Sequence, residues 1–360
     1  MQYIIVSYET GNYNFSESTS LSECLIVARR TDEHFDNEET NFVLLLKKPR
    51  TSIEAIALAN VIEAKEGDYV KAGESKAFLM NVQRDELLKN LDNWGRFISL
   101  PSPEILKEIK YILAGNLKLG SPKAKIPMKR LNELISSIGV DRHRFTDTFE
   151  VVDDWVLGSV PMLHGGEEAQ RKRMSTSPNA YALPIIERGK ALFEEIAGNL
   201  HVPNRIRVDT AHVTSMYSDE RLISNIFYAV RLKNESEGRL KALCLWLNTT
   251  WGILTVLTSR EETHGGFISL NQSHWRLLPA LDIDSLAKNK IKALAKIYDE
   301  FKDKELARIP EQYGSKGEVD KLRVQLDLSF LKCLGIQVEE SVLLSLYSQI
   351  GSSLAQWMGA

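Results

Sequence analysis

The sequence predicts an α+β fold with three parts: a small β/α sheet over residues 1–115, a β-rich domain over residues 116–280 and a helical subdomain over residues 281–360. Three observations predict this order. Short apolar runs come first, irregular strand-like segments fill the middle, and long stretches with helical periodicity follow Pro279. A chain of 360 residues is long enough for two or three domains, each with its own core.

The N-terminal part begins with three short apolar runs bounded by polar, Pro or Gly residues. We interpret them as neighbouring strands: Tyr3 to Val6, Cys24 to Ala28, and Phe42 to Leu46. A helix fits Ser52 to Ala64, with Thr51 or Ser52 as its N-cap and Glu54 near the positive end of its dipole. Helical spacing also covers Arg84 to Asn93 and Pro103 to Leu113. Prolines and glycines between Ile98 and Ala124 mark the best internal boundary.

The middle part is irregular and rich in predicted strands. The strand candidates are Trp155 to Leu157, Ile206 to Val208, Ile226 to Leu232, and Phe267 to Leu270. One helix, Leu240 to Asn248, has apolar residues on all sides, so we expect it at the centre of this domain's core.

The C-terminal part is predicted to be helical. Steps of three and four residues place one set of apolar side chains on a single helix face: Ala287, Ile291, Leu294, Tyr298 and Phe301. Two more helices follow, Val319 to Leu334, which Gly335 stops, and Glu339 to Trp357.

The charge balance excludes one class of protein and points to a local surface. Forty-five basic and 48 acidic residues give a net charge of −3, which excludes a polybasic coat. Between Leu117 and Phe145, however, the sequence contains seven basic residues and two acidic ones. This local excess fits a phosphate-facing surface and a solvated helical face with a loop equally well.

Sequence motifs for stand-alone chemistry are absent. The chain has no Gly-x-Gly, Walker loop, Cys-x-x-Cys, His-Glu-x-x-His or Gly-x-Ser-x-Gly, and its seven histidines lack metal-ligand spacing. The three cysteines, Cys24, Cys244 and Cys333, are interpreted as reduced thiols. No apolar stretch reaches the ~20 residues that a bilayer requires, and no export signal is visible, so we expect a cytoplasmic protein.

Four segments, in order along the chain, resemble N6-adenine DNA methyltransferases of restriction-modification type. IIVSYETGNYNFSESTSLSECLIVARR (Ile4 to Arg30) and FVLLLKKP (Phe42 to Pro49) are similar to the last strands of the catalytic domain in that family. The segment from Leu243 to Leu270, with its LNTTWG core, resembles a target recognition domain. HWRLLPALDIDSL (His274 to Leu286) resembles the exit from such a domain into a long helix.

The resemblance also implies what this chain lacks. The family's catalytic Asn/Asp-Pro-Pro-Tyr motif occurs nowhere in the sequence, and its methyl-donor motif is expected upstream of Ile4. In that family the Asn/Asp side chain and a proline carbonyl of this motif accept hydrogen bonds from the adenine amino group. Because this chain lacks the motif, we expect it to transfer no methyl group by itself. The resemblance thus implies the C-terminal part of an enzyme, as a truncation, a separately encoded half or an excised piece. S-adenosylmethionine would serve the complete enzyme, and no cofactor or metal is expected in this chain.

Double-stranded DNA is the partner that the resemblance implies, and basic residues in loops and strands are its candidate contacts. Alternation predicts that Arg205 and Arg207 share one strand face. For the clusters around Arg205 and Arg207 and around Arg260 and His264, the alternative is a structural turn with surface charge. For residues 171–173, the alternative is a disordered surface loop. The candidate contacts are Lys129, Arg130, Arg142, Arg144, Arg171, Arg173, Arg205, Arg207, His212, Arg260 and His264.

A second hypothesis is a protein-interaction subunit without direct DNA readout. In it, the helical C-terminus and an exposed strand edge near Tyr3 dock a catalytic methyltransferase subunit.

Overall fold

The computed structural model confirms the α+β class. It describes residues 3–7, 9, 24–28, 39–64, 69–89, 94–97, 102–117, 119, 124–139, 145–165, 171–259 and 267–358. The chain divides into two compact units: unit 1 is Met1–Lys107, Glu261–Gly266 and Ser352–Ala360, and unit 2 is Glu108–Arg260 and Phe267–Gly351. The three domain boundaries drawn from the sequence stay a prediction.

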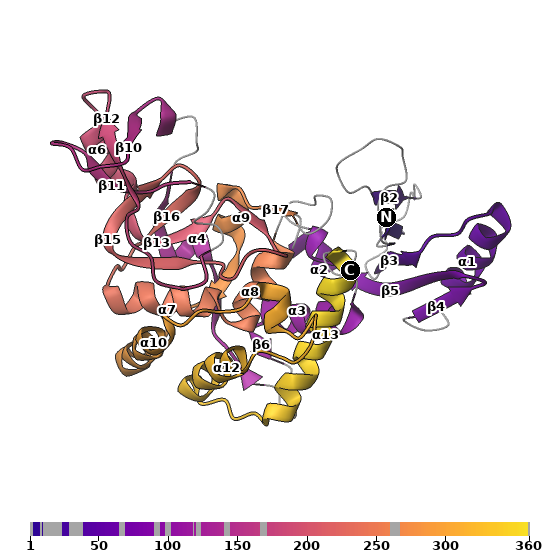
Figure 1. Cartoon of the computed structure of the whole chain (residues 1–360). Coiled ribbons are helices and arrows are strands. Elements are labelled where there is room, and N and C mark those ends of the chain that lie inside the picture. Colours follow the sequence, from indigo (N-terminus) through magenta and orange to yellow (C-terminus); the bar gives the residue numbers. More distant parts are fainter. Residues whose placement is uncertain are drawn as a thin grey trace. The chain divides into compact units, whose positions relative to one another are not determined.

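Unit 1 is built on a five-stranded sheet in the order β2-β1-β3-β5-β4 (Figure 1). Its strands are β1 Tyr3–Ser7, β2 Cys24–Val27, β3 Glu39–Lys47, β4 Tyr69–Ala72 and β5 Ser75–Gln83. Among the described strands of this sheet, β1 and β3 pair in parallel and the other neighbours are antiparallel. The first three strands confirm the predicted ones. The β4–β5 hairpin was not predicted, because lysines and a Gly-containing turn interrupt its apolar pattern.

The predicted free edge near Tyr3 is wrong. β1 lies inside the sheet, because Tyr3 pairs with Val27 of β2 on one side and with Asn41 of β3 on the other. Among the described strands the sheet ends at β2 and β4. The short strand β2 runs antiparallel to β1 and occupies the edge that the prediction left open.

Helix α1, Ser52–Ala64, has the predicted bounds and the predicted cap. The hydroxyl of Thr51 accepts a hydrogen bond from the backbone N–H of Glu54 at 3.2 Å. Leu58 is the buried residue of α1, and it packs with Val43, Leu79 and others into the unit 1 core. Two short helices follow β5: α2 Arg84–Lys89 and the 3-10 helix η1 Trp94–Phe97. Helix α3, Pro103–Leu113, has the predicted bounds.

Unit 2 contains a seven-stranded sheet in the order β10-β12-β11-β15-β13-β16-β9. Its strands are β9 Ile135–Ile138, β10 Phe149–Val152, β11 Val160–Leu163, β12 Ala180–Pro184, β13 Gly198–Pro203, β15 Met216–Ser224 and β16 Phe227–Leu232. Three two-stranded ribbons join β6 Asn116–Leu117 to β7 Ala124–Lys125, β8 Met128–Arg130 to β18 Pro279–Leu281, and β14 Arg205–Arg207 to β17 Phe267–Ser269. Short helices α4 Leu131–Leu134 and α6 Gly189–Ile196 connect strands.

Two consecutive helices, α7 Glu237–Leu247 and α8 Thr250–Thr258, form the centre of unit 2. Every residue of α7 from Leu240 to Leu247 is buried, which confirms the predicted core helix. Helix α8 is buried along its whole length. No single described helix has the length and apolar character to cross a membrane; α7 and α8 reach them only as a pair bent by 72°.

The predicted strand from Trp155 to Leu157 is wrong. These residues form the turn between β10 and β11, where the hydroxyl of Ser159 donates to the carbonyl of Val156 at 2.7 Å. Gly158 has φ +90°, which supports a turn. Trp155 and Leu157 are 62% and 88% exposed, so these apolar side chains do not belong to the core.

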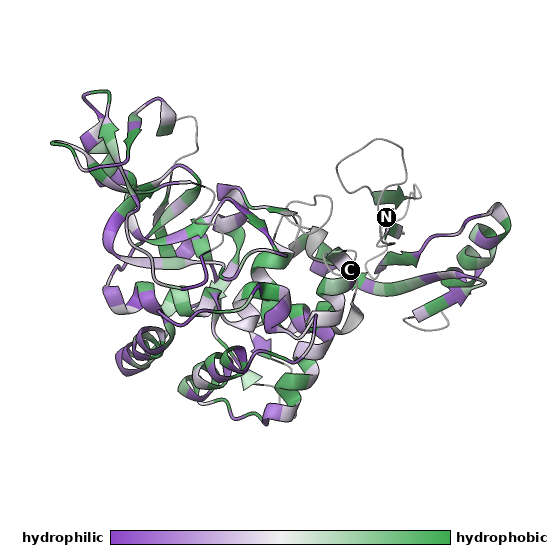
Figure 2. Ribbon diagram, in the orientation of Figure 1, coloured by the Kyte–Doolittle hydropathy of each residue, from purple (hydrophilic) through white to green (hydrophobic). Residues whose placement is uncertain are grey.

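Among the described C-terminal helices, the three long ones follow the prediction closely, whereas the two short ones, over residues 272–277 and 309–312, were not predicted. The helices are α9 Gln272–Leu277, α10 Lys288–Phe301, α11 Ile309–Gln312, α12 Lys321–Leu334 and α13 Glu340–Met358. In α10, Ile291, Leu294, Tyr298 and Phe301 are buried, whereas the outer face is hydrophilic (Figure 2). Ala287 differs from the prediction, because it is the exposed N-cap and not an inward residue. Gly335, with φ +84°, ends α12 as expected.

Candidate nucleic-acid interface

A two-stranded ribbon, β14 with β17, displays two of the predicted arginines. Arg205, Ile206 and Arg207 pair with Ser269, Ile268 and Phe267. Both arginines are exposed, and Ile206 between them is 3% exposed. Alternation along the strand therefore puts both guanidinium groups on the solvent side, as predicted. We call this pair of strands the arginine ribbon.

The arginine ribbon is mounted on a buried support. The backbone N–H of Leu270 donates to the carbonyl of Asn204 at 2.9 Å, directly beside the ribbon. The indole N–H of Trp275 in α9 donates to the carbonyl of Pro203 at 2.9 Å, and Trp275 is fully buried. Asn271 caps α9 by accepting from the backbone N–H of His274 at 3.1 Å. These contacts restrict the freedom of the ribbon relative to α9.

A second basic ribbon is attached to the same support. β8 pairs with β18, with Lys129 opposite Ala280 and Arg130 opposite Pro279. Because β17, α9 and β18 are consecutive in the chain, one segment joins the ribbon of Arg205 and Arg207 to that of Lys129 and Arg130. Four of the predicted contacts thus share one framework.

The same segment contributes a cation that the sequence reading missed. Arg276 lies on α9 and is exposed. Arg276 is a candidate because it is exposed on a short helix between two basic ribbons. The sequence alone does not show this position, because it depends on the pairing of β17 with β14 and of β18 with β8.

Arg207 is held by a carboxylate from the turn that follows it. The Nε of Arg207 lies 2.9 Å from Oδ1 and 3.2 Å from Oδ2 of Asp209. The carbonyl of Arg207 accepts from the backbone N–H of Thr210 at 3.1 Å and from that of Ala211 at 2.8 Å, which closes the turn. Asp209 was not among the predicted site residues, because an acidic residue is not an obvious DNA contact.

His212, a predicted DNA contact, lies in the interior and not on the surface. It is 8% exposed, and its Nδ1 is 2.7 Å from the carbonyl oxygen of Leu306. Its own carbonyl accepts from Nε2 of Gln312 at 2.8 Å. The physical reason is that the chain turns inward after Asp209, so the alternation that exposes Arg207 does not continue to His212. We therefore assign it to packing.

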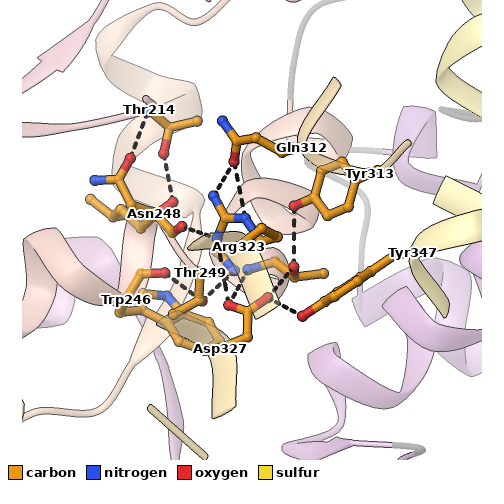
Figure 3. Close-up of polar contacts among 12 residues, drawn as sticks. Thr214, Trp246, Asn248, Thr249, Gln312, Tyr313, Arg323, Asp327 and Tyr347 are labelled. Atoms are coloured by element: carbon orange, nitrogen blue, oxygen red, sulfur yellow. Dashed lines mark hydrogen bonds and ion pairs between the residues drawn. The ribbon is translucent and has the colours of Figure 1, made fainter. Parts of the chain in front are cut away.

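The turn also leads directly into a buried polar network (Figure 3). The backbone N–H of Thr214 donates to Oδ1 of Asn248 at 2.9 Å, and Asn248 is fully buried between α7 and α8. The Nδ2 of Asn248 donates to the carbonyl oxygens of Ser215 and Cys244, both at 2.9 Å. One amide side chain thus fixes the chain after the arginine ribbon to the end of α7.

Arg323 and Asp327 of α12 complete this network, and both are fully buried. Arg323 donates through Nη1 to the carbonyl of Asn248 at 2.6 Å and through Nε to Oε1 of Gln312 at 3.0 Å. Asp327 accepts from the backbone N–H of Thr250 at 3.1 Å and from the hydroxyl of Tyr347 at 2.7 Å. The network therefore connects the α7–α8 junction to the C-terminal helices (Figure 3).

Charges in this network are stabilised by their partners. Burial alone would lower the pKa of Arg323, but the charge of the Asp327 carboxylate helps to raise it, so the guanidinium keeps its charge. Burial raises the pKa of Tyr313 to about 12, so its phenol stays protonated and can bond with Thr250 at 3.2 Å. The network gives structural support and contains no obvious reactive group.

Two further predicted contacts, Arg171 and Arg173, line a cavity of about 650 Å³. Its other lining residues are Lys172, Ser175, Thr176, Ser177, Asp219, Lys302, Asp303 and Glu305. Arg173 and Lys172 both pair with Glu305, at 3.2 and 3.6 Å. Burial lowers the pKa of Arg171.

The segment that contributes these two arginines is fixed by backbone hydrogen bonds. The N–H of Ser175 donates to the carbonyl of Lys302 at 3.1 Å, and that of Leu306 donates to the carbonyl of Lys172 at 2.9 Å. The cavity contains the carboxylates of Asp219, Asp303 and Glu305 as well as cations.

The remaining predicted contacts lie outside the described residues: Arg142, Arg144, Arg260 and His264. Within the described part of the chain, no three His, Cys, Asp or Glu side chains form a group that could hold a metal ion.

Several solved structures are similar to this chain, and one of them is the type IIG restriction endonuclease BpuSI. The TM-score is 0.44 and the sequence identity 9%, over 99% of this chain and 44% of that one, so this chain spans less than half of BpuSI. No protein-family model matches the chain, and no curated protein matches it.

Proposed function

We propose that this chain is the DNA sequence recognition part of an adenine-N6 DNA methyltransferase from a restriction-modification or related defence system. Methyl transfer and S-adenosylmethionine binding would belong to motifs outside this chain. The observation that supports DNA recognition best is the arginine ribbon, with Arg205 and Arg207 on its solvent side. The methyltransferase part of the proposal rests on the sequence resemblance.

The shape of the arginine ribbon suits DNA. The major groove of B-DNA is about 12 Å wide and admits a two-stranded β-ribbon. Arginine is the side chain that most often reads guanine there, whereas lysines and arginines beside the groove bind phosphates. We assign base contact to Arg205 and Arg207, and phosphate contact to Lys129, Arg130 and Arg276.

The test is binding of the full chain to labelled duplex DNA, measured by fluorescence anisotropy at about 50 and 200 mM salt. If the three assigned cations neutralise three phosphates, affinity should fall roughly fortyfold over this range. Replacing both Lys129 and Arg130 by alanine should lower the slope of log affinity against log salt by about 2.

Arg188→Ala is the matched control, because Arg188 is an exposed arginine at the start of α6, and α6 lies away from α9 (Figure 1). It should leave the slope unchanged. Undetectable binding at the lower salt concentration would contradict the proposal.

A second candidate function is docking of a catalytic methyltransferase subunit. It is favoured by β2, an end strand of the described sheet whose Leu25, Ile26 and Val27 are 49%, 53% and 39% exposed. An apolar edge strand can pair with another chain. Ile26→Lys should then abolish co-elution with that subunit in gel filtration while DNA binding stays unchanged. Unaltered co-elution would exclude β2 as the contact.

A further inference from the structure

The contact between Arg207 and Asp209 orients one end of the guanidinium group. Both carboxylate oxygens of Asp209 lie at Nε, at 2.9 and 3.2 Å. The two terminal nitrogens of Arg207 have no hydrogen-bond partner among the described residues, and the side chain is 67% exposed. An arginine whose Nε is occupied presents both Nη groups outward as a planar pair of donors.

The turn that contains Asp209 is itself held in place. Ala211 accepts at its carbonyl from the backbone N–H of Ile309 at 2.8 Å. His212 is bonded to Leu306 and Gln312, and Thr214 is bonded to buried Asn248. Hydrogen bonds at Ala211, His212 and Thr214 therefore fix the backbone beyond Asp209. Because this backbone is fixed, the carboxylate of Asp209 can hold the side chain of Arg207 in one orientation.

A pair of parallel donors matches one base edge in particular. Guanine presents two acceptors, N7 and O6, in the major groove, and a planar arginine fork bonds to both. Adenine, cytosine and thymine each present at most one acceptor there, so the same fork would leave one donor unpaired.

The spacing between Arg205 and Arg207 is set by the geometry of the strand that carries both. Side chains two residues apart on one strand face are separated by about 6.6 Å. Base pairs along one DNA strand are spaced about 3.4 Å apart, so this distance corresponds to two base-pair steps. Arg205 is therefore placed over the base pair two steps from the one that Arg207 faces, if the arginine ribbon follows the groove.

We propose that Arg207, positioned by Asp209, reads a guanine in the major groove, and that Arg205 contacts the base pair two steps away. This inference rests on the proposed function of DNA recognition. It assigns Asp209 the role of a positioning residue and Arg207 that of the residue that determines specificity at one base pair.

The experiment selects bound duplexes from a pool with a randomised centre, using the full chain and four variants. Wild type should give a site with guanine at the position of Arg207. Arg207→Ala should reduce the preference for that guanine by about tenfold to a hundredfold and leave the other positions unchanged. Arg207→Lys keeps the charge and loses the fork, so it should retain the salt dependence of binding but lose the preference.

Asp209→Ala separates positioning from folding. It removes a negative charge beside the DNA, so affinity for random duplex should rise or stay equal while the guanine preference falls. A merely structural role would instead lower both together. Arg188→Ala is the control variant and should reproduce the wild-type site, and circular dichroism melting checks that every variant is folded.

The outcomes distinguish the inference from the proposed function. A selected site that survives in Arg207→Ala, or a preference that Asp209→Ala leaves intact, overturns the inference while DNA recognition stands. Selection of no preferred sequence by a wild-type chain that binds duplex also overturns it. Failure of wild type to bind any duplex overturns both proposals.

Discussion

Burial of a single histidine makes the stability of unit 2 depend on pH. His201 in β13 is fully buried, and burial lowers the pKa of its imidazole to about 4. In the unfolded chain a histidine has a pKa of about 6.5, so below that pH the unfolded state binds a proton that the folded state does not bind until about pH 4. Stability should therefore fall as the pH is lowered through this window, by roughly 3 kcal/mol in total.

The measurement is urea unfolding of wild type and His201→Gln between pH 7.5 and pH 4. The variant should show a smaller loss of stability over this range. At pH 7.5 the imidazole is neutral in both states, so the difference there reports packing alone. Equal pH dependence in the two proteins would show that His201 does not titrate as described.

At the scale of elements, the junction of α7 and α8 depends on two residues of the LNTTWG motif. Asn248 bonds to Thr214, Ser215 and Cys244. A side chain at Gly252 would overlap the carbonyl oxygen of Trp246, so only glycine fits there. The motif that suggested a target recognition domain therefore has a structural explanation, which is a tight bend between two buried helices.

Removing both charges of the buried pair should destabilise the protein by less than the sum of the two single removals. Arg323 and Asp327 are fully buried, and their closest approach is 3.5 Å. Asp327→Asn leaves the guanidinium uncompensated in the interior, so we expect a loss of about 3–5 kcal/mol. The double replacement Arg323→Met and Asp327→Leu should lose less than the sum of the single changes.

Urea unfolding of both single variants and the double variant measures this coupling. An Asp327→Asn loss below about 1 kcal/mol would mean that the remaining hydrogen bonds of Arg323, to Asn248 and Gln312, suffice to stabilise its charge.

At the scale of the whole molecule, local sequence signals predicted elements better than their assembly. The bounds of α1 and α3 and the burial of α7 follow from spacing and caps within each segment. The turn at Trp155 was mistaken for a strand, because a short apolar run does not reveal exposure. The place of β1 inside the sheet depends on β2, whose pairing no local pattern encodes.

The candidate site shows the same division between local and distant information. Alternation predicted that Arg205 and Arg207 share a face, since both lie on one strand. The role of Asp209, the exposure of Arg276 and the burial of His212 depend on how distant segments such as residues 306–312 pack against the turn. Sequence spacing alone contains none of that information.

The assignment of recognition and catalysis to different polypeptide segments leads to a prediction for the whole chain. An adenine amino group needs the acceptors of an Asn/Asp-Pro-Pro-Tyr motif to be methylated, and the sequence contains no such motif. The isolated chain, incubated with labelled S-adenosylmethionine and duplex DNA at the low salt concentration of the binding test, should therefore incorporate no label into the DNA. Because binding and transfer are measured on the same sample, lack of turnover can be separated from lack of binding. Incorporation of label into adenine would show that residues of this chain supply the acceptors.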